Sequence, residues 1–127
     1  MPTLYLLFSH SLTEEQKQDA QKNLGVDAFV SLPEELQQLF SNVPPNLKEL
    51  KTYLKPIKKW MEKHIQPQDF VLIQGDFGVT YKLVRYCKKL EATAVYATTE
   101  RKSVDETQAD GSVVTKRVFK HCLFRVY

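Results

Sequence analysis

Three short segments of the chain carry residue types from which a phosphate-ester site could be built. The first is Ser9-His10-Ser11, where an imidazole stands between two hydroxyl groups at the end of an apolar run. An unperturbed imidazole titrates near neutrality, so His10 can donate or accept a proton at physiological pH. Neither His64 nor His121 has a comparable setting. His10 is therefore the strongest candidate for an acid or a base.

The second segment is Gln74–Gly78 (QGDFG), which follows another apolar run. Its glycines would let the backbone approach a ligand, and a helix beginning here would present free N–H groups to an anion. Ser11 and Thr80 could donate hydroxyl hydrogen bonds to the same ligand. The segment has neither the dinucleotide-binding glycine pattern nor the lysine of a phosphate-binding loop. From the loop alone, a plain strand-to-helix turn is an equally good interpretation.

The third segment is Thr98–Lys102 (TTERK), which ends in two cations. Arg101 and Lys102 would complement the charge of a phosphodiester, and Thr99 stands beside them. We expect this segment to end a strand at the same rim as the other two segments. The alternative is a charged pair on an exposed loop, which is common.

Other chemistries find no support in the residues. The G-x-S-x-G motif of acyl transfer is absent, and no two histidines have the spacing of metal ligands. Cys87 and Cys122 are isolated, which indicates reduced thiols in a cytosolic protein rather than a disulfide framework. We expect no metal site and no cofactor.

The elements that must position these segments alternate between strands and helices. Apolar runs at residues 4–8, 26–32, 69–73 and 92–98 predict four strands. Helices are predicted at about residues 13–24 and from Pro33, then over residues 47–65 with a kink or break at Pro56, and after the QGDFG turn. An Asp110-Gly111 turn then joins an extended segment to a long final strand, Val113–Tyr127.

This order favours an α/β fold with a mainly parallel sheet, helices on both faces and a C-terminal β-hairpin. In such sheets ligands bind beyond the carboxyl ends of the strands, at the point where the strand order reverses. If the first and third strands are central neighbours, the Ser9–Ser11 and Gln74–Gly78 turns meet at that point. The length of 127 residues predicts one domain, residues 1–127.

The composition limits the partners that we expect. The net charge is only +3, from 18 basic and 15 acidic side chains, which does not favour a long nucleic acid as ligand. No apolar stretch reaches the length of a membrane helix, so we expect a cytoplasmic protein without a membrane partner. A domain of this size has a small core that a homodimer would help to stabilise.

Five segments, taken in order, resemble the small standalone accessory proteins of type III CRISPR systems. They cover nearly the whole chain, and QGDFG and YATTER are the most distinctive parts of them: LLFSHSLTEEQ, LPEELQQLFSNVPP, VLIQGDFGVTY, VYATTERKSV and DGSVVTKRVFKHCLFRVY. The resemblance implies a Rossmann-like (CARF-like) three-layer sandwich, and several small members of this group are ring nucleases.

The resemblance also implies a ligand and a reaction. Such proteins bind cyclic oligoadenylates, the second messengers of type III CRISPR antiviral defence, and ring nucleases cut them to end the signal. The cut is a metal-independent attack of a ribose 2′-hydroxyl on the adjacent phosphorus. Cyclic tetra-adenylate is the foremost candidate, and its near two-fold symmetry would match a homodimer with the site on its axis.

The implied roles fall on the three segments described above. His10 would transfer a proton or stabilise the phosphate, and Arg101 and Lys102 would neutralise the phosphodiester. The other residues of the site would bind the ligand through the backbone, by reading adenine or ribose edges, or by stacking on a base: Ser9, Ser11, Gln74, Gly75, Asp76, Phe77, Gly78, Thr80 and Thr99.

Two other functions fit the same residues. The pocket could sequester or sense the messenger without cutting it, and a more distant alternative is a protein-interaction subunit with no small ligand. The residues also leave open the ring size, and whether the C-terminal hairpin forms a dimer interface or covers the ligand. Alternating apolar residues at Phe119, Leu123 and Tyr127 favour the interface.

Overall fold

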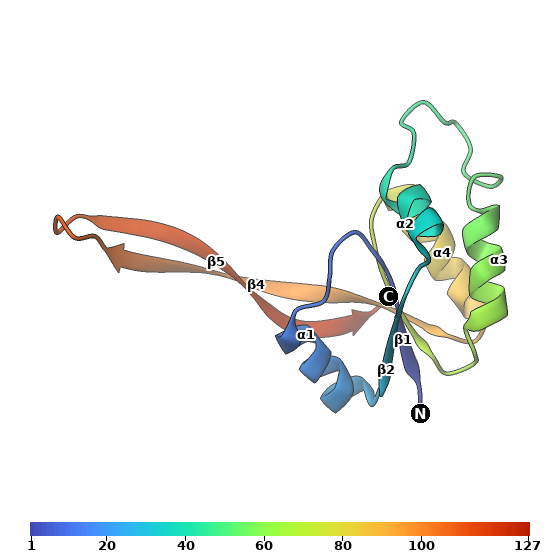
Figure 1. Cartoon of the computed structure of the whole chain (residues 1–127), viewed down its shortest axis with the longest axis horizontal. Coiled ribbons are helices and arrows are strands. Elements are labelled where there is room, and N and C mark those ends of the chain that lie inside the picture. The colour runs from blue at the N-terminus through green and yellow to red at the C-terminus, as the bar shows by residue number, and fades with distance from the viewer.

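The computed structural model describes all 127 residues, and its central feature is a five-stranded sheet (Figure 1). The strand order is β2-β1-β3-β4-β5. The first four of these strands run parallel and β5 is antiparallel to β4. In chain order the strands are β1 (Thr3–Phe8), β2 (Ala28–Ser31), β3 (Phe70–Gln74), β4 (Thr93–Thr107) and β5 (Val113–Val126).

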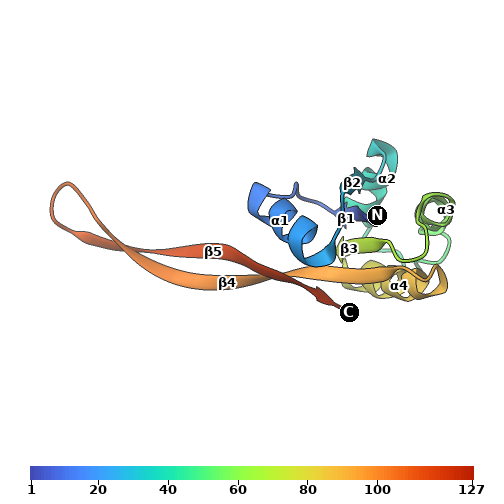
Figure 2. The ribbon, with the colours of Figure 1, turned by 90° about the horizontal axis from the view of Figure 1, so that it is seen from below.

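Helices cover both faces of this sheet. The segment α1 and its π-helical continuation η1 lie on one side, and α2, α3 and α4 lie on the other (Figures 1 and 2). The fold is therefore α/β with a mostly parallel sheet and a C-terminal antiparallel hairpin, compatible with a Rossmann-like fold, as the sequence predicts. The helical bounds are α1 (Glu14–Asp19), η1 (Ala20–Leu24), α2 (Glu34–Ser41), α3 (Lys55–His64) and α4 (Phe77–Lys89).

The first helix begins and ends where the sequence predicts. Gln16 N donates to Thr13 Oγ1 at 3.2 Å, and Thr13 N donates to Gln16 Oε1 at 2.9 Å, which completes the capping box. Gly25 ends the helical segment with a φ of 70°, a conformation that glycine adopts without a steric penalty.

Two elements differ from the prediction. The third helix begins at Lys55 rather than near residue 47, with Pro56 in its first turn. A proline fits there because the first-turn N–H groups have no partner within the helix, whereas a proline further along would interrupt it. The fourth strand does not end at Thr98: β4 continues to Thr107, because β5 pairs with it along that whole length.

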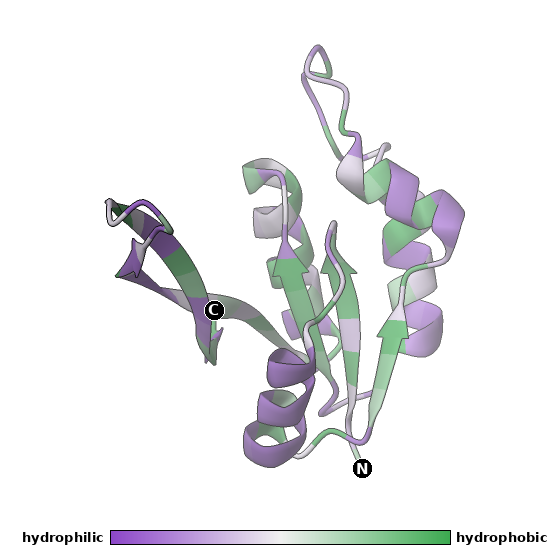
Figure 3. Ribbon diagram, turned by 60° about the vertical axis from the view of Figure 1, so that its left-hand side comes forward, coloured by the Kyte–Doolittle hydropathy of each residue, from purple (hydrophilic) through white to green (hydrophobic).

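The core lies between the sheet and the helices α2, α3 and α4. In Figure 3 the strands of the body are mostly hydrophobic, whereas α1 is hydrophilic and buries no residue. The largest fully buried side chains come from β1, β3 and β4 and from the chain that covers them: Leu4, Leu7, Val71, Leu72, Ile73, Val95, Phe40, Leu54, Ile57, Met61, Val79 and Leu83.

Beyond the body, residues 99–107 of β4 and 113–121 of β5 form a two-stranded ribbon, here called the arm, which extends away from the sheet (Figures 1 and 2). It begins at a β-bulge between Ala97 and Thr99. Gly111, with a φ of 88°, lies in the turn at its tip. Among the helices of the molecule, none has both the length and the apolar character needed to cross a bilayer.

Candidate functional site

The Ser9–Ser11 and Gln74–Gly78 turns lie side by side at the carboxyl edge of the sheet. The strands that lead into them are neighbours, with Phe8 of β1 in register with Gln74 of β3. From β1 the chain proceeds outward to β2, and from β3 it proceeds the other way to β4. The strand order therefore reverses between β1 and β3, which confirms the predicted meeting point of the two turns.

The turn after β1 is held by α2. Gln37 Nε2 donates to the carbonyl oxygen of Phe8 at 3.0 Å and to Ser41 Oγ at 3.0 Å, and Ser41 Oγ lies 2.9 Å from Ser9 Oγ. Ser9 is thus committed to a structural hydrogen bond. The next residue, His10, is exposed and has no hydrogen-bond partner, and its ring meets Phe8 edge-on at 6.2 Å between centroids. The imidazole is free to contact a ligand.

The turn after β3 ends in a capped helix. Asp76 Oδ2 accepts a hydrogen bond from Val79 N at 3.1 Å, and the carbonyl oxygen of Asp76 accepts one from Thr80 N at 2.8 Å. A carboxylate therefore already faces the positive end of the α4 dipole, where an anion would otherwise bind. A phosphate is better accommodated beside the β1 turn, and Asp76 is suited to accept hydrogen bonds from hydroxyl or amino groups.

Packing accounts for Gly75 and leaves only tight space at Gly78. A Cβ at Gly75 would lie 2.8 Å from Phe40 Cζ, and one at Gly78 would lie 3.0 Å from Leu50 Cδ1. Real Cβ atoms do not approach other atoms as closely as 2.8 Å. Gly75 in particular makes room for the Phe40 ring of α2, and the backbone at Gly75 remains exposed.

The other side chains near this turn differ in how accessible they are. Phe77 is 93% exposed, which is unusual for a large aromatic side chain and leaves its ring free to stack on a base. The hydroxyl of Thr80, in contrast, is buried and has no hydrogen-bond partner. Gln74 Oε1 accepts from Ala97 N at 2.9 Å and joins β3 to β4, which leaves its amide nitrogen without a partner.

Thr99, Arg101 and Lys102 lie on the arm and not beside the two turns. Arg101 is four residues beyond Ala97, which contacts the end of β3, and this spacing corresponds to roughly 13 Å along a strand. The guanidinium of Arg101 lies 5.5 Å from the ring centroid of Phe119, and Lys102 Nζ lies 3.9 Å from Glu100 Oε1. Within one chain the structure does not bring these cations together with His10.

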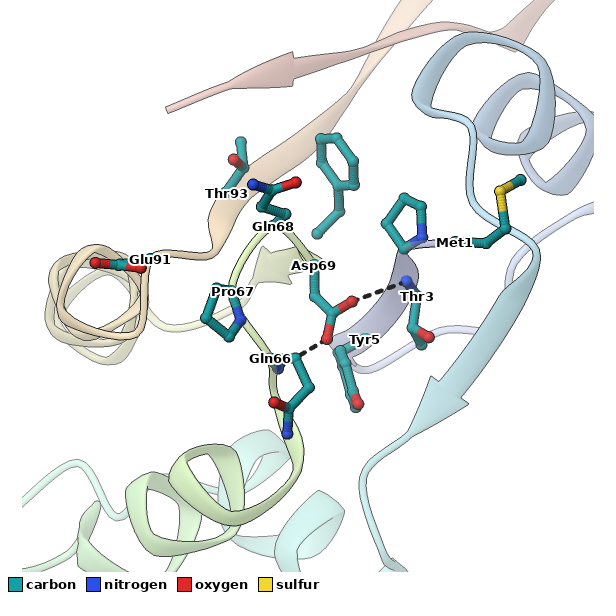
Figure 4. Close-up of a pocket in the computed structure, with 11 residues that line it drawn as sticks. Met1, Thr3, Tyr5, Gln66, Pro67, Gln68, Asp69, Glu91 and Thr93 are labelled. Atoms are coloured by element: carbon teal, nitrogen blue, oxygen red, sulfur yellow. Dashed lines mark hydrogen bonds between the residues drawn. The ribbon is translucent and has the colours of Figure 1, made fainter.

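A large hollow lies at the opposite edge, at the amino ends of the strands (Figure 4). It has a volume of about 670 Å³, and the buried Asp69 lies in its wall. Both carboxylate oxygens are occupied: Thr3 N donates to Oδ1 at 3.0 Å and Gln66 N donates to Oδ2 at 2.8 Å. The Asp69 carboxylate therefore links the start of β1 to the loop that precedes β3, and we assign this hollow a structural role.

Sequence patterns did not reveal a half-buried pair at the base of the arm. His121 Nε2 lies 2.6 Å from Asp19 Oδ2, and the two side chains are 5% and 14% exposed. Burial raises the pKa of Asp19, but hydrogen bonds from Asn23 and His121 and the positive charges of His121 and Lys22 outweigh it, so the pKa is lowered. The partners are 102 residues apart, and no local motif signals a contact at that separation.

The fold and this edge define an α/β protein with a doubly wound, mostly parallel sheet. A family model described as the Uncharacterized protein MJ1673 family matches residues 2–125, and the chain belongs to that family. The chain is 53% identical over 127 residues to Uncharacterized protein MJ1673 of Methanocaldococcus jannaschii, an alignment that covers 100% of this chain and 98% of that protein. No solved structure matches the chain.

Proposed function

We propose that the protein binds a cyclic oligoadenylate, foremost cyclic tetra-adenylate, at the carboxyl edge between β1 and β3 and cleaves it. The observation that carries the proposal is the adjacency of the Ser9–Ser11 and Gln74–Gly78 turns where the strand order reverses. Nucleotide ligands bind at this point of doubly wound sheets. The exposed His10 and Phe77 supply a proton-transfer group and a stacking surface there. A CARF-like variant of the fold is part of the proposal.

The proposed reaction needs no reactant other than the ligand. A ribose 2′-hydroxyl attacks the adjacent phosphorus, and the bond from phosphorus to the 5′-oxygen breaks as the new bond forms. The 2′-hydroxyl loses a proton and the departing 5′-oxygen gains one, which leaves a 2′,3′-cyclic phosphate and a 5′-hydroxyl. His10 carries out one of these transfers or donates to a non-bridging oxygen. General acid–base catalysis of this kind typically contributes about 10²–10⁴-fold.

The distribution of charge suggests how the ligand lies. The Asp76 carboxylate disfavours a phosphate at the start of α4, so the scissile phosphate belongs beside His10 and Ser11, which are exposed and have no hydrogen-bond partner. Asp76 then accepts from a ribose hydroxyl or an adenine amino group, while Phe77 stacks on a base. Positioning of this kind aligns the attacking and departing oxygens.

The proposal includes a homodimer in which Arg101 and Lys102 act on the partner's site. The arm has no third strand on either edge, and a two-stranded ribbon is marginally stable alone in water. Apolar side chains remain exposed on it: Val104, Val113, Val114, Val118 and Phe119. A second copy that covers the arm would bury these side chains and could receive the two cations at its own β1–β3 edge.

The direct test is cleavage of labelled cyclic tetra-adenylate in excess EDTA. We expect linear products that end in 2′,3′-cyclic phosphate. The His10→Ala protein should cut about 100-fold or more slowly while its affinity stays nearly unchanged, and His64→Ala, an exposed histidine on α3, should cut normally. Wild-type rates in His10→Ala would contradict the assignment of His10.

Subunit mixing tests the contribution of the arm. His10→Ala and Arg101→Ala homodimers would each be inactive, but their heterodimer would contain one intact site if Arg101 acts across the interface. We expect activity to reappear on mixing. If a mixture that exchanges subunits recovers no activity, Arg101 does not act across the interface. The assignment of the β1–β3 site then depends on the cleavage test with His10→Ala.

A non-catalytic binder, acting as a sensor or sponge, is the alternative favoured by the exposed ring of Phe77 and the capped start of α4. It predicts tight binding without products, and ligand at about 100 times its dissociation constant would stabilise the fold by roughly 2.7 kcal/mol. A protein-interaction subunit predicts neither cleavage nor a thermal shift. We propose that the protein acts in the cytoplasm in either form, and that its cleavage of the messenger switches off type III CRISPR signalling.

A further inference from the structure

The outward face of α4 is a separate surface that the proposed site does not use. Residues Tyr81 and Arg85 are four positions apart and are both exposed, so they share one side of the helix. Tyr81 is 61% exposed. The buried residues of α4, Val79, Leu83 and Cys87, occupy the opposite side. Nothing in the fold covers the outward side.

This face is strongly cationic. The sequence of α4 contains four basic residues and no acidic one, and α3 adds Lys58 beside them. A hollow of about 190 Å³ is lined by side chains from both helices, namely Lys58, Tyr81, Lys82, Arg85, Tyr86 and Lys89. A neighbouring hollow of about 330 Å³ shares Lys82 and extends the cationic surface to Lys48 and Lys51.

These cations have no carboxylate partners. The three ion pairs of the molecule involve Lys102, Lys116 and His121, and none of them lies on this face. Two carboxylates are nearby: Glu49 lines the second hollow, and Glu62 accepts a hydrogen bond from the Tyr86 hydroxyl at 3.1 Å. Burial lowers the pKa of Lys58, and the charges of Lys82, Lys89 and Lys51 lower it further, as expected of uncompensated like charges held together.

Aromatic rings are interleaved with the cations. Lys58 Nζ lies 5.3 Å from the centroid of the Tyr86 ring, and the Arg85 guanidinium lies 5.6 Å from that of Tyr81. Arg85 Nη1 also donates to the Tyr81 hydroxyl at 3.1 Å. These contacts fix the orientation of the Tyr81 ring beside the hollow and leave much of it exposed.

We infer that the α3–α4 face binds a single-stranded nucleic acid, with its cations on the phosphates and Tyr81 stacked on a base. Proteins that bind single strands combine a positive groove with exposed aromatic rings in this way, and stacking tolerates any base. The net charge of +3 disfavours such a ligand for the molecule as a whole. The charge is, however, concentrated on one face, and that local density determines binding. An acidic protein would use the cations but would leave the exposed ring without a role.

The test is fluorescence anisotropy with a labelled mixed-sequence single-stranded RNA and its DNA counterpart, at several salt concentrations. The two hollows together contain six cations: Lys48, Lys51, Lys58, Lys82, Arg85 and Lys89. If all of them neutralise phosphates, a plot of log Kd against log salt concentration should rise with a slope of about 4. We expect the triple variant Lys82→Glu, Arg85→Glu, Lys89→Glu to lose binding by more than tenfold. A control with the same change of charge elsewhere, Lys17→Glu, Lys63→Glu, Lys120→Glu, should lose far less.

A second pair of variants isolates stacking. Tyr81→Ala should weaken binding about tenfold, whereas Tyr81→Phe keeps the ring and should bind normally. Three results would each overturn the inference. The first is unchanged affinity in Tyr81→Ala, and the second is an equal loss of affinity in the two triple variants. The third is binding to anionic vesicles but not to either oligonucleotide. Both the Tyr81 variants and the α4 triple variant should still cleave cyclic tetra-adenylate, and His10→Ala should still bind the oligonucleotide, so the two proposals fail separately.

Discussion

The contact between His121 and Asp19 joins the base of the arm to the first helical segment, and its contribution to stability can be worked out from the structure. The His121 Nε2 to Asp19 Oδ2 distance is 2.6 Å, and both side chains are largely buried. A hydrogen bond to a charged group contributes about 1.5–3 kcal/mol. Replacement of His121 by alanine also removes the contact of its ring with Phe124, at 4.9 Å between centroids. We therefore expect His121→Ala to lower the free energy of unfolding by about 1.5–3 kcal/mol or more.

Thermal and urea unfolding would measure the loss. For a chain of 127 residues, 1 kcal/mol corresponds to roughly 3–5 °C in melting temperature, so the expected decrease is roughly 5–15 °C. His10→Ala is the matched control, because His10 is exposed and makes no hydrogen bond. Its effect should stay within about 0.5 kcal/mol.

The same contact predicts a pH dependence. The pKa of Asp19 is lowered in the folded protein, because hydrogen bonds from Asn23 and His121 and nearby positive charges outweigh the effect of burial. Its contribution to stability is therefore present above the unfolded pKa, about 3.9, and is lost as the pH falls through the folded pKa. The difference in unfolding free energy between wild type and Asp19→Asn should shrink over that acidic range. A His121→Ala protein with the wild-type melting temperature, or a difference that does not change with acid, would refute the reasoning.

Three further predictions concern packing, capping and thiol reactivity. Gly75→Ala would bring a Cβ to 2.8 Å from Phe40 Cζ. It should lower the free energy of unfolding in urea by about 1–3 kcal/mol. An unchanged free energy would mean that Phe40 can move aside. Thr13→Ala removes the capping box and should cost about 1 kcal/mol, with an unchanged urea midpoint as the contrary result. Burial raises the pKa of Cys87 to about 12, so iodoacetamide at neutral pH should alkylate the exposed Cys122 and spare Cys87. Intact-mass spectra that show two modifications per folded chain would contradict the described burial.

Much of the fold could be predicted from the sequence because the two central strands, β1 and β3, are mostly buried. Leu4–Phe8 and Phe70–Gln74 stand out as short apolar runs, which is typical of central strands. The capping box at Thr13 and the turn at Asp110-Gly111 have local signals, and both occur where they were predicted. The sequence allowed the adjacency of β1 and β3 only as an assumption, and the strand pairing of the structure shows it.

Other features depend on contacts that no local pattern encodes. The sequence predicts an extended segment before the Asp110-Gly111 turn, but it does not indicate that this segment joins the fourth strand beyond Thr98, because only its pairing with β5 determines this. The glycine at position 75 suggested a close approach to a ligand, yet the Phe40 ring occupies the space that a side chain would need. Likewise, the net charge of the whole chain conceals the cationic face of α3 and α4, since acidic residues elsewhere balance it.

The most direct measurement of the central claim is a titration of ¹⁵N-labelled His10→Ala protein with cyclic tetra-adenylate, followed by amide chemical shifts. This variant should bind the ligand without cutting it, so the complex persists during the measurement. We expect the largest shifts at Ser9–Ser11 and Gln74–Gly78, and smaller ones on the arm if a partner's arm reaches the site. Shifts centred on the hollow around Asp69, or no shifts at saturating ligand, would contradict the claim that the β1–β3 edge is the binding site.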